Sequence, residues 1–236
     1  MANKHLQPTP VLMLKVESAF LAHGYHALTM EMLAEACNFS RRALYFYFSS
    51  KSDAFRAAIR FRNDLALTTG FETGRKRWSA GDNALDIIAS IINIRYGDTR
   101  RIANASPHMI ELNAEVFTQC VDIVRDVAIY FEAELAAFIM ELRDGGLVKL
   151  RPGVTAVQLA RAIADGARGV NQRLPPVPPR ELAARYHDMC RYVLYGGAEL
   201  PKARKRPRPR RTRKLYSRPA RTSSSGPHRR SAGARG

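Results

Sequence analysis

The sequence has few of the features that mark secreted, membrane or disulfide-bonded proteins. Its three cysteines, Cys37, Cys120 and Cys190, are odd in number and far apart, which does not indicate a disulfide framework and fits a reducing compartment. The longest apolar stretches, residues 85–94 and 121–140, are interrupted by charged residues, so neither is expected to span a membrane. No secretion signal is visible. We therefore expect a cytoplasmic protein.

Sequence motifs of catalysis and metal binding are also missing. The chain has no phosphate loop of the G-x-x-x-x-G-K-[ST] kind, no G-x-G-x-x-G, no H-E-x-x-H and no cysteine pair at metal-binding spacing. His23 and His26 lie on either side of Gly24, where a helix should stop, so they do not share a helix face. We predict that the protein is not an enzyme and needs no cofactor or metal.

Strand-like alternation is absent, and the apolar residues recur at helical spacing instead. The composition, 46% hydrophobic and 25% charged over 236 residues, is typical of a soluble globular protein. Capping residues and Gly or Pro punctuation divide the chain into helices. We predict an all-α fold with helices over residues 10–23, 30–37, 41–48, 51–67, 82–96, 107–117, 119–143, 155–173 and 179–195.

Acidic residues are unevenly distributed along the chain. Residues 201–236 contain 14 Lys and Arg and no acid, residues 64–200 contain 16 basic and 17 acidic residues, and residues 1–63 contain 8 and 4. Most of the formal charge of +17 therefore belongs to the last segment, which we predict to be a basic disordered tail. We divide the rest into an N-terminal domain over residues 1–50 and a longer helical domain over residues 51–200.

The short helices near the N-terminus predict a helix-turn-helix. Thr29 can cap the first of the two helices, Asn38 tolerates the left-handed turn conformation, and Ser40 can cap the second. On a helical wheel, the second helix turns one apolar side inward and the opposite side outward. The inward side holds Ala43, Leu44, Tyr47 and Phe48, and the outward side holds Arg41, Arg42, Tyr45 and Phe46.

This outward side favours DNA as the partner. It combines two arginines with two aromatic rings, and no acid occurs over residues 36–52. Arginine can form paired hydrogen bonds with guanine or phosphate, an apolar ring can contact a thymine methyl, and a tyrosine hydroxyl can donate to phosphate. The alternative, a solvated charged face, leaves the aromatic rings unexplained.

A run of residues across three predicted helices and a turn matches a known pattern: Ala19-Phe20, Gly24-Tyr25, Leu28-Thr29-Met30, Leu33-Ala34, Ala36, Phe39-Ser40, Leu44-Tyr45-Phe46-Tyr47-Phe48 and Ser50-Lys51. With this run, residues 12–59 strongly resemble the N-terminal DNA-binding domain of the tetracycline-repressor (TetR) family. The resemblance implies an all-helical homodimer that binds a palindromic operator on double-stranded DNA and is released by a small-molecule effector. It implies base contacts by Arg41, Arg42 and Phe46, and phosphate contacts by Thr29, Ser40, Tyr45, Tyr47 and Lys51. Departures from the family are Asn38 for the usual turn Gly, Cys37 for Ala, and Ser52 and Ala54 for the common Glu and Leu.

The longer helical half is expected to bind the effector and to form the dimer. Polar residues on otherwise apolar segments are candidates for the pocket lining, with exposure or structural hydrogen bonding as the alternative for each. Apolar spacing in the last two helices favours a four-helix bundle across a two-fold axis, with packing inside one chain as the alternative. The lining candidates are Asn93, Arg95, Tyr96, His108, Asn113 and Gln119, and the dimer candidates are Gly166, Ala167, Val170, Leu182, Tyr186, Met189 and Val193.

The function predicted is sequence-specific DNA binding by a transcriptional regulator, with repression as the default action. As a mechanism, the effector is expected to tilt the helix that starts near Lys51 and so to change the spacing of the two recognition helices. Two other functions remain open. The protein could bind DNA nonspecifically through its basic tail, as nucleoid proteins do, or it could be a helical small-molecule-binding protein.

Overall fold

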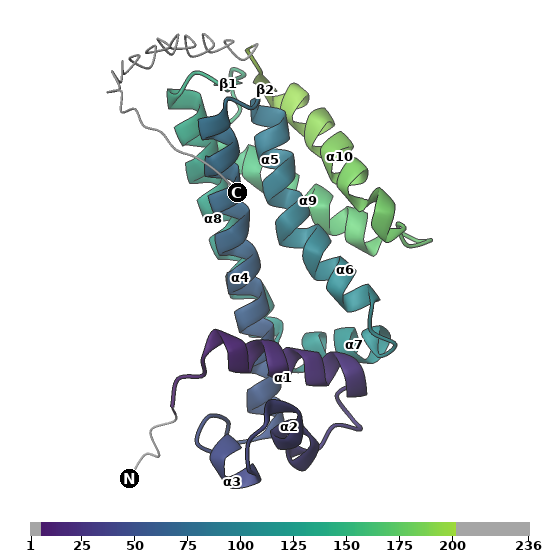
Figure 1. Cartoon of the computed structure of the whole chain (residues 1–236). Helices are drawn as coiled ribbons and strands as arrows, with labels where there is room; N and C mark the ends of the chain where they lie inside the picture. Colours follow the sequence, from purple (N-terminus) through teal and green to yellow (C-terminus); the bar gives the residue numbers. More distant parts are fainter. Residues whose placement is uncertain (1–5, 202–236) are drawn as a thin grey trace, which may run out of the picture. The chain divides into compact units, whose positions relative to one another are not determined.

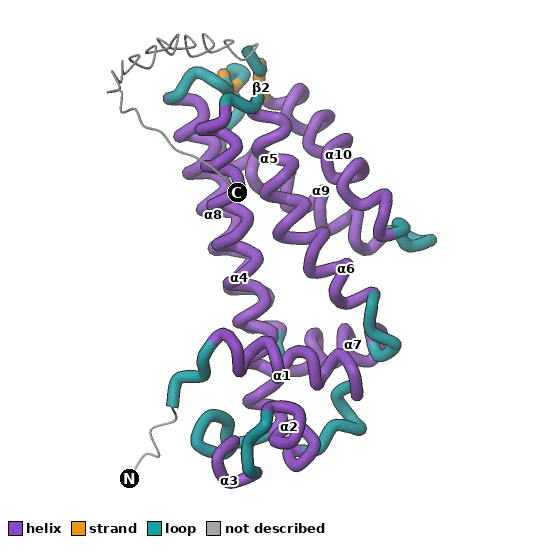
Figure 2. Tube along the Cα trace, viewed as in Figure 1, coloured by secondary structure: helices purple, strands orange, loops and turns teal. Residues whose placement is uncertain are grey.

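The computed structural model describes residues 6–201 and consists mainly of helices (Figure 2). The all-α fold class predicted from the sequence is confirmed. Two strands of two residues each, β1 (Lys149–Leu150) and β2 (Ala198–Glu199), pair antiparallel; β1 lies in the connection between two long helices, and β2 follows the last described helix. None of the helices within residues 6–201 is long and apolar enough to cross a membrane. The basic tail predicted for residues 201–236 lies, apart from Pro201, outside the described residues.

Three short helices form the N-terminal unit (Figure 1): α1 (Pro10–His23), α2 (Met30–Cys37) and α3 (Arg41–Leu44). Leu12, Val16 and Phe20 from one face of α1 are buried, as their spacing predicts. Gly24 ends α1 with a φ of 74°, a conformation that glycine adopts without a steric penalty. The buried faces of α1, α2 and α3 share one apolar core with the helices that follow.

A single long helix, α4 (Lys51–Ala80), connects this unit to the rest of the chain (Figure 1). Its 30 residues extend for about 45 Å, at a rise of about 1.5 Å per residue. The predicted end at residue 67 is wrong, because the helix continues past Gly70 and Gly74 to Gly81. Both internal glycines are buried against Ile91 of the next helix, where the absence of a side chain allows close packing.

The helical rod that follows α4 also extends further than predicted, to residue 104 instead of 96, and its helix type changes midway. It begins as α5 (Ala84–Ile92), continues as the π-helix η1 (Asn93–Asp98) and ends as α6 (Thr99–Asn104). The remaining helices begin and end within two residues of the predicted positions, except that the last has a short 3₁₀ start. They are α7 (Met109–Gln119), α8 (Val121–Asp144), α9 (Ala156–Gln172), η2 (Pro179–Glu181) and α10 (Leu182–Gly197).

The packing of these helices places α7 next to the N-terminal unit (Figure 1). The helix α8 lies along α4 and contacts α9, and α10 packs on α9 and α5. The helix α7 contacts α1, α4 and α8. Besides α4, it is therefore an element of the helical half that contacts the DNA-binding candidate.

Candidate nucleic-acid interface and adjoining pockets

The helix-turn-helix geometry follows from local capping. The Thr29 hydroxyl accepts a hydrogen bond from the Met32 N–H at 3.2 Å, which caps α2. Asn38 ends α2 in the left-handed conformation, with φ 61° and ψ 40°. The Ser40 hydroxyl then accepts from the Ala43 N–H at 3.2 Å and starts α3. The two caps and the turn residue are the ones that the sequence predicts.

The helix that carries the arginines is shorter than predicted. It is α-helical only over Arg41–Leu44, and the chain then tightens into a turn over residues 45–47. The reason is a change in hydrogen bonding, since the Phe46 N–H donates to the Ala43 carbonyl at 3.2 Å and the Tyr47 N–H to the Leu44 carbonyl at 2.9 Å. These bonds span three residues and belong to the tighter 3₁₀ geometry.

Leu44 and Phe48 are fully buried, whereas Arg41, Arg42 and Phe46 are exposed on the opposite side. The Arg41 guanidinium pairs with the Glu31 carboxylate of α2 at 2.5 Å and lies over the Tyr45 ring. Its pKa is raised, chiefly by the hydrogen bond to Tyr45 and then by Glu31. Both partners of the Arg41–Glu31 pair are more than half exposed, so the pair is weak enough for DNA to displace. Arg42 has no hydrogen-bond or ion-pair partner within residues 6–201, so its guanidinium is free to bind a base edge.

The predicted phosphate contacts differ in how freely they can act. Thr29 and Ser40 are exposed but already serve as caps, and the Tyr47 ring packs edge-on against Phe39 with centroids 5.6 Å apart. The Lys51 ammonium donates to the Tyr25 carbonyl at 2.8 Å and the His26 carbonyl at 3.3 Å. A lysine ammonium has three donors, so one remains for a phosphate. Contact of these residues with DNA stays a prediction.

The polar contacts between α7 and the N-terminal unit centre on Gln119. Its amide oxygen accepts from the Tyr25 hydroxyl at 3.0 Å and from the Ser52 hydroxyl at 2.6 Å. One turn before, the Glu115 carboxylate lies 3.3 Å from the His26 ring. The Glu111 carboxylate accepts from the His26 N–H at 2.6 Å, which is the main cause of the lowered pKa of Glu111. We call this set, Tyr25, His26, Ser52, Glu111, Glu115 and Gln119, the α7 junction.

A bidentate ion pair adds to the same contact region. The Arg56 guanidinium of α4 donates to both carboxylate oxygens of Asp122, at 2.9 and 2.6 Å, and to the Gln119 carbonyl. This hydrogen bonding by Arg56 lowers the pKa of Asp122 to about 2. The start of α8 is thereby tied to the first turns of α4.

Two pockets lie between the helices of the larger half and share a wall. The first, which we call the arginine pocket, has a volume of about 540 Å³ and is lined by Arg95, Arg100, Arg168 and Arg173 among others. The second, which we call the apolar pocket, has a volume of about 310 Å³ and reaches Phe20 of α1, Phe55 of α4 and Leu112 of α7. The residues common to both are Arg95, Thr99, Ala103, Asn113, Phe117, Val124 and Asn171.

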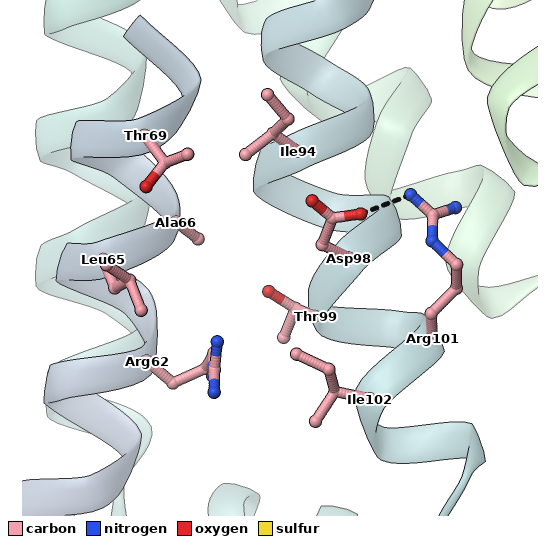
Figure 3. Close-up of a pocket in the computed structure, with 9 residues that line it drawn as sticks. All are labelled: Arg62, Leu65, Ala66, Thr69, Ile94, Asp98, Thr99, Arg101 and Ile102. Atoms are coloured by element: carbon pink, nitrogen blue, oxygen red, sulfur yellow. Dashed lines mark hydrogen bonds and ion pairs between the residues drawn. The ribbon is translucent and has the colours of Figure 1, made fainter. Parts of the chain in front are cut away.

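A third pocket of about 340 Å³ lies between α4 and the η1–α6 rod (Figure 3). Leu65 and Thr69 of α4 line one side, and Ile94 and Ile102 line the other. Asp98 on its edge is paired with Arg101 at 2.5 Å. It shares Arg62, Thr99 and Ile102 with the apolar pocket.

Three of the six predicted lining residues are brought together at these pockets, and three have other roles. Arg95 and Tyr96 line the arginine pocket, and Asn113 lines both it and the apolar pocket. The other three do not line these pockets, and their polar groups have partners within the described residues, so their contact with a ligand stays a prediction. Gln119 belongs to the α7 junction, His108 pairs with Glu111 at 3.4 Å, and Asn93 accepts from Arg101 at 3.1 Å.

The predicted dimer contacts of Ala167, Leu182 and Tyr186 are wrong. These side chains are fully buried by their own chain, and the Tyr186 hydroxyl donates to Asn171 of α9. Gly166 also serves packing within the chain, since a Cβ there would lie 2.7 Å from the Met189 sulfur. The apolar stripe of α10 thus covers α9 and α5. For the half-buried Val170, Met189 and Val193, contact with a second copy stays a prediction.

Sequence reasoning missed several residues of these sites. Glu31, the partner of Arg41, lies outside the acid-free stretch from which the interface was inferred. Arg168 and Asn171 were grouped with the dimer helices, yet both line the arginine pocket. Arg168 follows Ala164 by four residues, and Asn171 follows Ala167 by four residues. This helical spacing was the only signal in the sequence that both side chains face inward. Within residues 6–201 no group of three His, Cys, Asp or Glu could hold a metal ion.

A comparison with known protein families matches residues 17–58 to the DNA-binding domain described as "Bacterial regulatory proteins, tetR family". This range contains α2, α3 and the turn between them, together with the second half of α1 and the start of α4. No curated protein matches the chain by sequence.

Many solved structures share the fold at low sequence identity. A TetR transcription regulator from Haloarcula marismortui is 18% identical, with a TM-score of 0.59 over 80% of this chain and 97% of that one. A putative TetR-family transcriptional regulator from Rhodococcus sp. is 17% identical, with a TM-score of 0.58 over 78% and 96%. SmeT, the repressor of the Stenotrophomonas maltophilia multidrug efflux pump SmeDEF, is 17% identical, with a TM-score of 0.55 over 86% and 98%. At these identities the likeness shows the shared fold.

Proposed function

We propose that this chain, a TetR-family transcriptional regulator, is a homodimeric repressor that leaves its operator when a small molecule binds in the helical half. The observation that carries the proposal is the family match over residues 17–58 together with an exposed Arg41, Arg42 and Phe46 on the matched helix-turn-helix. SmeT has been solved in complex with triclosan, which supports a ligand site in a protein of this fold. Cytoplasmic location follows from a chromosomal target.

The proposed DNA contact uses both parts of the exposed face. Arg41 and Arg42 bind base edges or phosphates in the major groove, and the Phe46 ring, half exposed, meets an apolar base surface. Lys51 and the hydroxyls of Thr29 and Ser40 hold the flanking phosphates. Arg41 exchanges Glu31 for DNA, whereas Arg42 gives up no protein partner.

The proposed dimer brings two such faces onto one side of the duplex. Tyr192 and Tyr195 of α10 and Val157 of α9 are exposed, so the outward faces of these helices offer the apolar surface that the buried stripe does not. To bind two half-sites one turn of DNA apart, a two-fold dimer through them has to hold the recognition helices about 34 Å apart. A palindromic operator follows from that symmetry.

The proposed coupling between ligand and DNA runs through α7. Leu112 and Val116 face the apolar pocket, whereas Glu111, Glu115 and Gln119 on the same helix belong to the α7 junction. A ligand that displaces α7 therefore pulls on the Tyr25–His26 turn and on the first turns of α4. A shift of the N-terminal unit in each protomer changes the spacing of the recognition helices. This proposal adds α7 to the tilt of α4 that we expected from the sequence.

The DNA-binding part of the proposal is tested with the full chain and one matched pair of variants. Selection from random duplexes defines the operator, and anisotropy titration then measures its affinity. Arg42→Ala should cost about 1–3 kcal/mol per half-site and relax the preference at one base pair. Lys76→Ala removes one positive charge from an exposed position near the other end of α4 and should leave the preference unchanged. An unaltered base preference in Arg42→Ala would refute the proposed interface.

A further inference from the structure

Arg95 is a buried cation at the common wall of two pockets, and its guanidinium has no ion-pair partner among residues 6–201. It is 8% exposed, and its Nε has no hydrogen-bond partner. No carboxylate within residues 6–201 pairs with it, and its guanidinium instead lies over the rings of Tyr96 and Phe131, 5.1 and 5.9 Å from their centroids. Burial lowers the pKa of Arg95, as expected for a cation that has lost its water. An unpaired buried charge is costly unless a ligand completes it.

Asp64 lies near enough to affect Arg95 electrostatically, but within residues 6–201 it forms neither an ion pair nor a hydrogen bond with the Arg95 guanidinium. Of the described residues that line the arginine pocket, four are arginines and none is acidic. Arg168 is already neutralised, because it donates to Glu132 at 2.8 Å and to Asp165 at 2.6 Å. The side-chain amides of Asn113 and Asn171 lie in the same wall and can donate further hydrogen bonds. The position next to Arg95 therefore suits an anion.

The apolar pocket extends from the same point. Phe20 and Leu21 of α1, Ile59 of α4 and Val116 of α7 line it. Its other charged residues, Glu17 and Arg62, are ion-paired with each other and offer no free charge to a ligand. The two pockets together therefore present one buried cation at one end and apolar side chains at the other.

We propose that the ligand of this site is an amphipathic carboxylate, whose head group pairs with Arg95 and whose apolar tail occupies the pocket between α1, α4 and α7. The inference names the ligand class of the proposed function and rests on it. A charged hydrogen bond to a buried guanidinium is about twice as strong as a neutral one, so the head group should select against alcohols and amines. The tail contacts α1 directly, so the length of the ligand can affect the position of the DNA-binding unit.

The test measures binding to the full chain without DNA, by calorimetry, using three ligands that share one ten-carbon chain. Decanoate should bind at least ten times more tightly than decanol, and decylamine should bind more weakly than either. Butyrate, which has the head group without the long tail, should bind at least ten times more weakly than decanoate. All ligands are used below their micelle concentrations. Equal affinity for decanoate and decanol, or no binding of decanoate, overturns the proposal.

Variants of the head-group site separate a ligand-binding Arg95 from a structural one. Arg95→Met should weaken decanoate binding at least tenfold, leave decanol binding within about threefold and leave the melting temperature of the free protein equal or higher. Arg95→Lys keeps the charge and should retain the preference for decanoate over decanol. Arg173→Met, at an exposed position on the same pocket, should change decanoate binding by less than threefold. Equal losses in Arg95→Met and Arg173→Met, or loss of the preference in Arg95→Lys, overturn the assignment of the head group to Arg95.

Operator release is measured separately, so that the two proposals can fail independently. If decanoate binds through Arg95 but leaves operator affinity unchanged, the ligand class stands and the proposed release is wrong. If a neutral molecule releases the operator while decanoate does not bind through Arg95, the function stands and the ligand class is wrong.

Discussion

The fit of α4 against α5 predicts different effects of alanine on stability at two glycines of the same helix. At Gly70, an added Cβ would meet the Ile91 carbonyl oxygen at 3.4 Å, an ordinary contact. At Gly74, it would meet Cδ1 and Cγ1 of the same residue at 2.6 and 2.9 Å, and a carbon of the Phe138 ring at 3.4 Å. Ile91 is fully buried and Phe138 nearly so, which leaves little room for adjustment.

The magnitudes follow from helix propensity and overpacking. Replacing glycine by alanine inside a helix stabilises it by about 0.8–1 kcal/mol. Overpacking of a well-filled core costs about 1–3 kcal/mol. Gly70→Ala should therefore be neutral or stabilising, and Gly74→Ala should be less stable than Gly70→Ala by at least about 1 kcal/mol. For a chain of this size, that difference corresponds to about 2–4 °C in melting temperature.

The assay is thermal unfolding followed by circular dichroism for both variants and the unchanged chain. All are compared at one protein concentration, because association shifts the melting temperature. If the two variants melt at the same temperature, the close approach of α4 and α5 described here is wrong.

Three further predictions concern the α7 junction, its neighbouring ion pair and the thiols. Gln119→Ala removes the hydrogen bonds that Tyr25 and Ser52 donate to the Gln119 side chain. The coupling free energy between effector binding and operator binding should fall by about 1 kcal/mol, so the effector should change operator affinity by a factor about five times smaller. Anisotropy titrations of the operator with and without effector measure this change. Thr118→Ala, which loses only a bond within α7, is the control, and equal effects would contradict a specific role for Gln119. Because the folded-state pKa of Asp122, about 2, lies below the ordinary 3.8, its pair with Arg56 should stabilise the fold fully above about pH 4, and this contribution should be lost as the pH falls through about 2. Asp122→Asn should therefore flatten the pH dependence of the free energy of unfolding below about pH 4. Urea titrations at a series of pH values measure this free energy, and an unchanged pH dependence in the variant would show that the Arg56–Asp122 pair does not cause it. Burial raises the pKa of all three thiols: that of Cys37, that of Cys120 to about 11 and that of Cys190 to about 12. A thiol reagent at neutral pH should therefore react slowly with the native chain and rapidly with all three cysteines in denaturant. Rapid modification of the native chain would show that a cysteine is accessible.

The N-terminal unit could be predicted closely because its boundaries have local causes. The Thr29 and Ser40 hydroxyls each accept a hydrogen bond from the backbone N–H three residues later, and Asn38 ends α2 in the left-handed conformation. The 3₁₀ turn after Leu44 was not foreseen, since no residue there breaks a helix and the tightening is visible only in the hydrogen bonds.

The longer half was harder to predict because its boundaries depend on neighbouring helices. Gly70 and Gly74 resemble interruptions in the sequence, yet their contact with Ile91 makes them part of a continuous helix. The apolar stripe at Leu182 and Tyr186 indicates burial but does not say whether the cover is the same chain or a second copy. Arg95 and His108 look alike in the sequence, as polar residues near apolar segments. Only the structure shows that Arg95 lines a pocket whereas His108 pairs with Glu111.

The most direct test of the central claim compares the base preference of two altered chains selected against the same random duplex library. A chain truncated after Leu200 lacks the basic tail but keeps the helix-turn-helix, whereas Arg41→Ala/Arg42→Ala in the full chain does the reverse. The truncated chain should recover the operator of the full chain, with lower nonspecific affinity and a shallower salt dependence, while the double variant should bind without preference. A preference that survives the double substitution and disappears with the tail would contradict the claim.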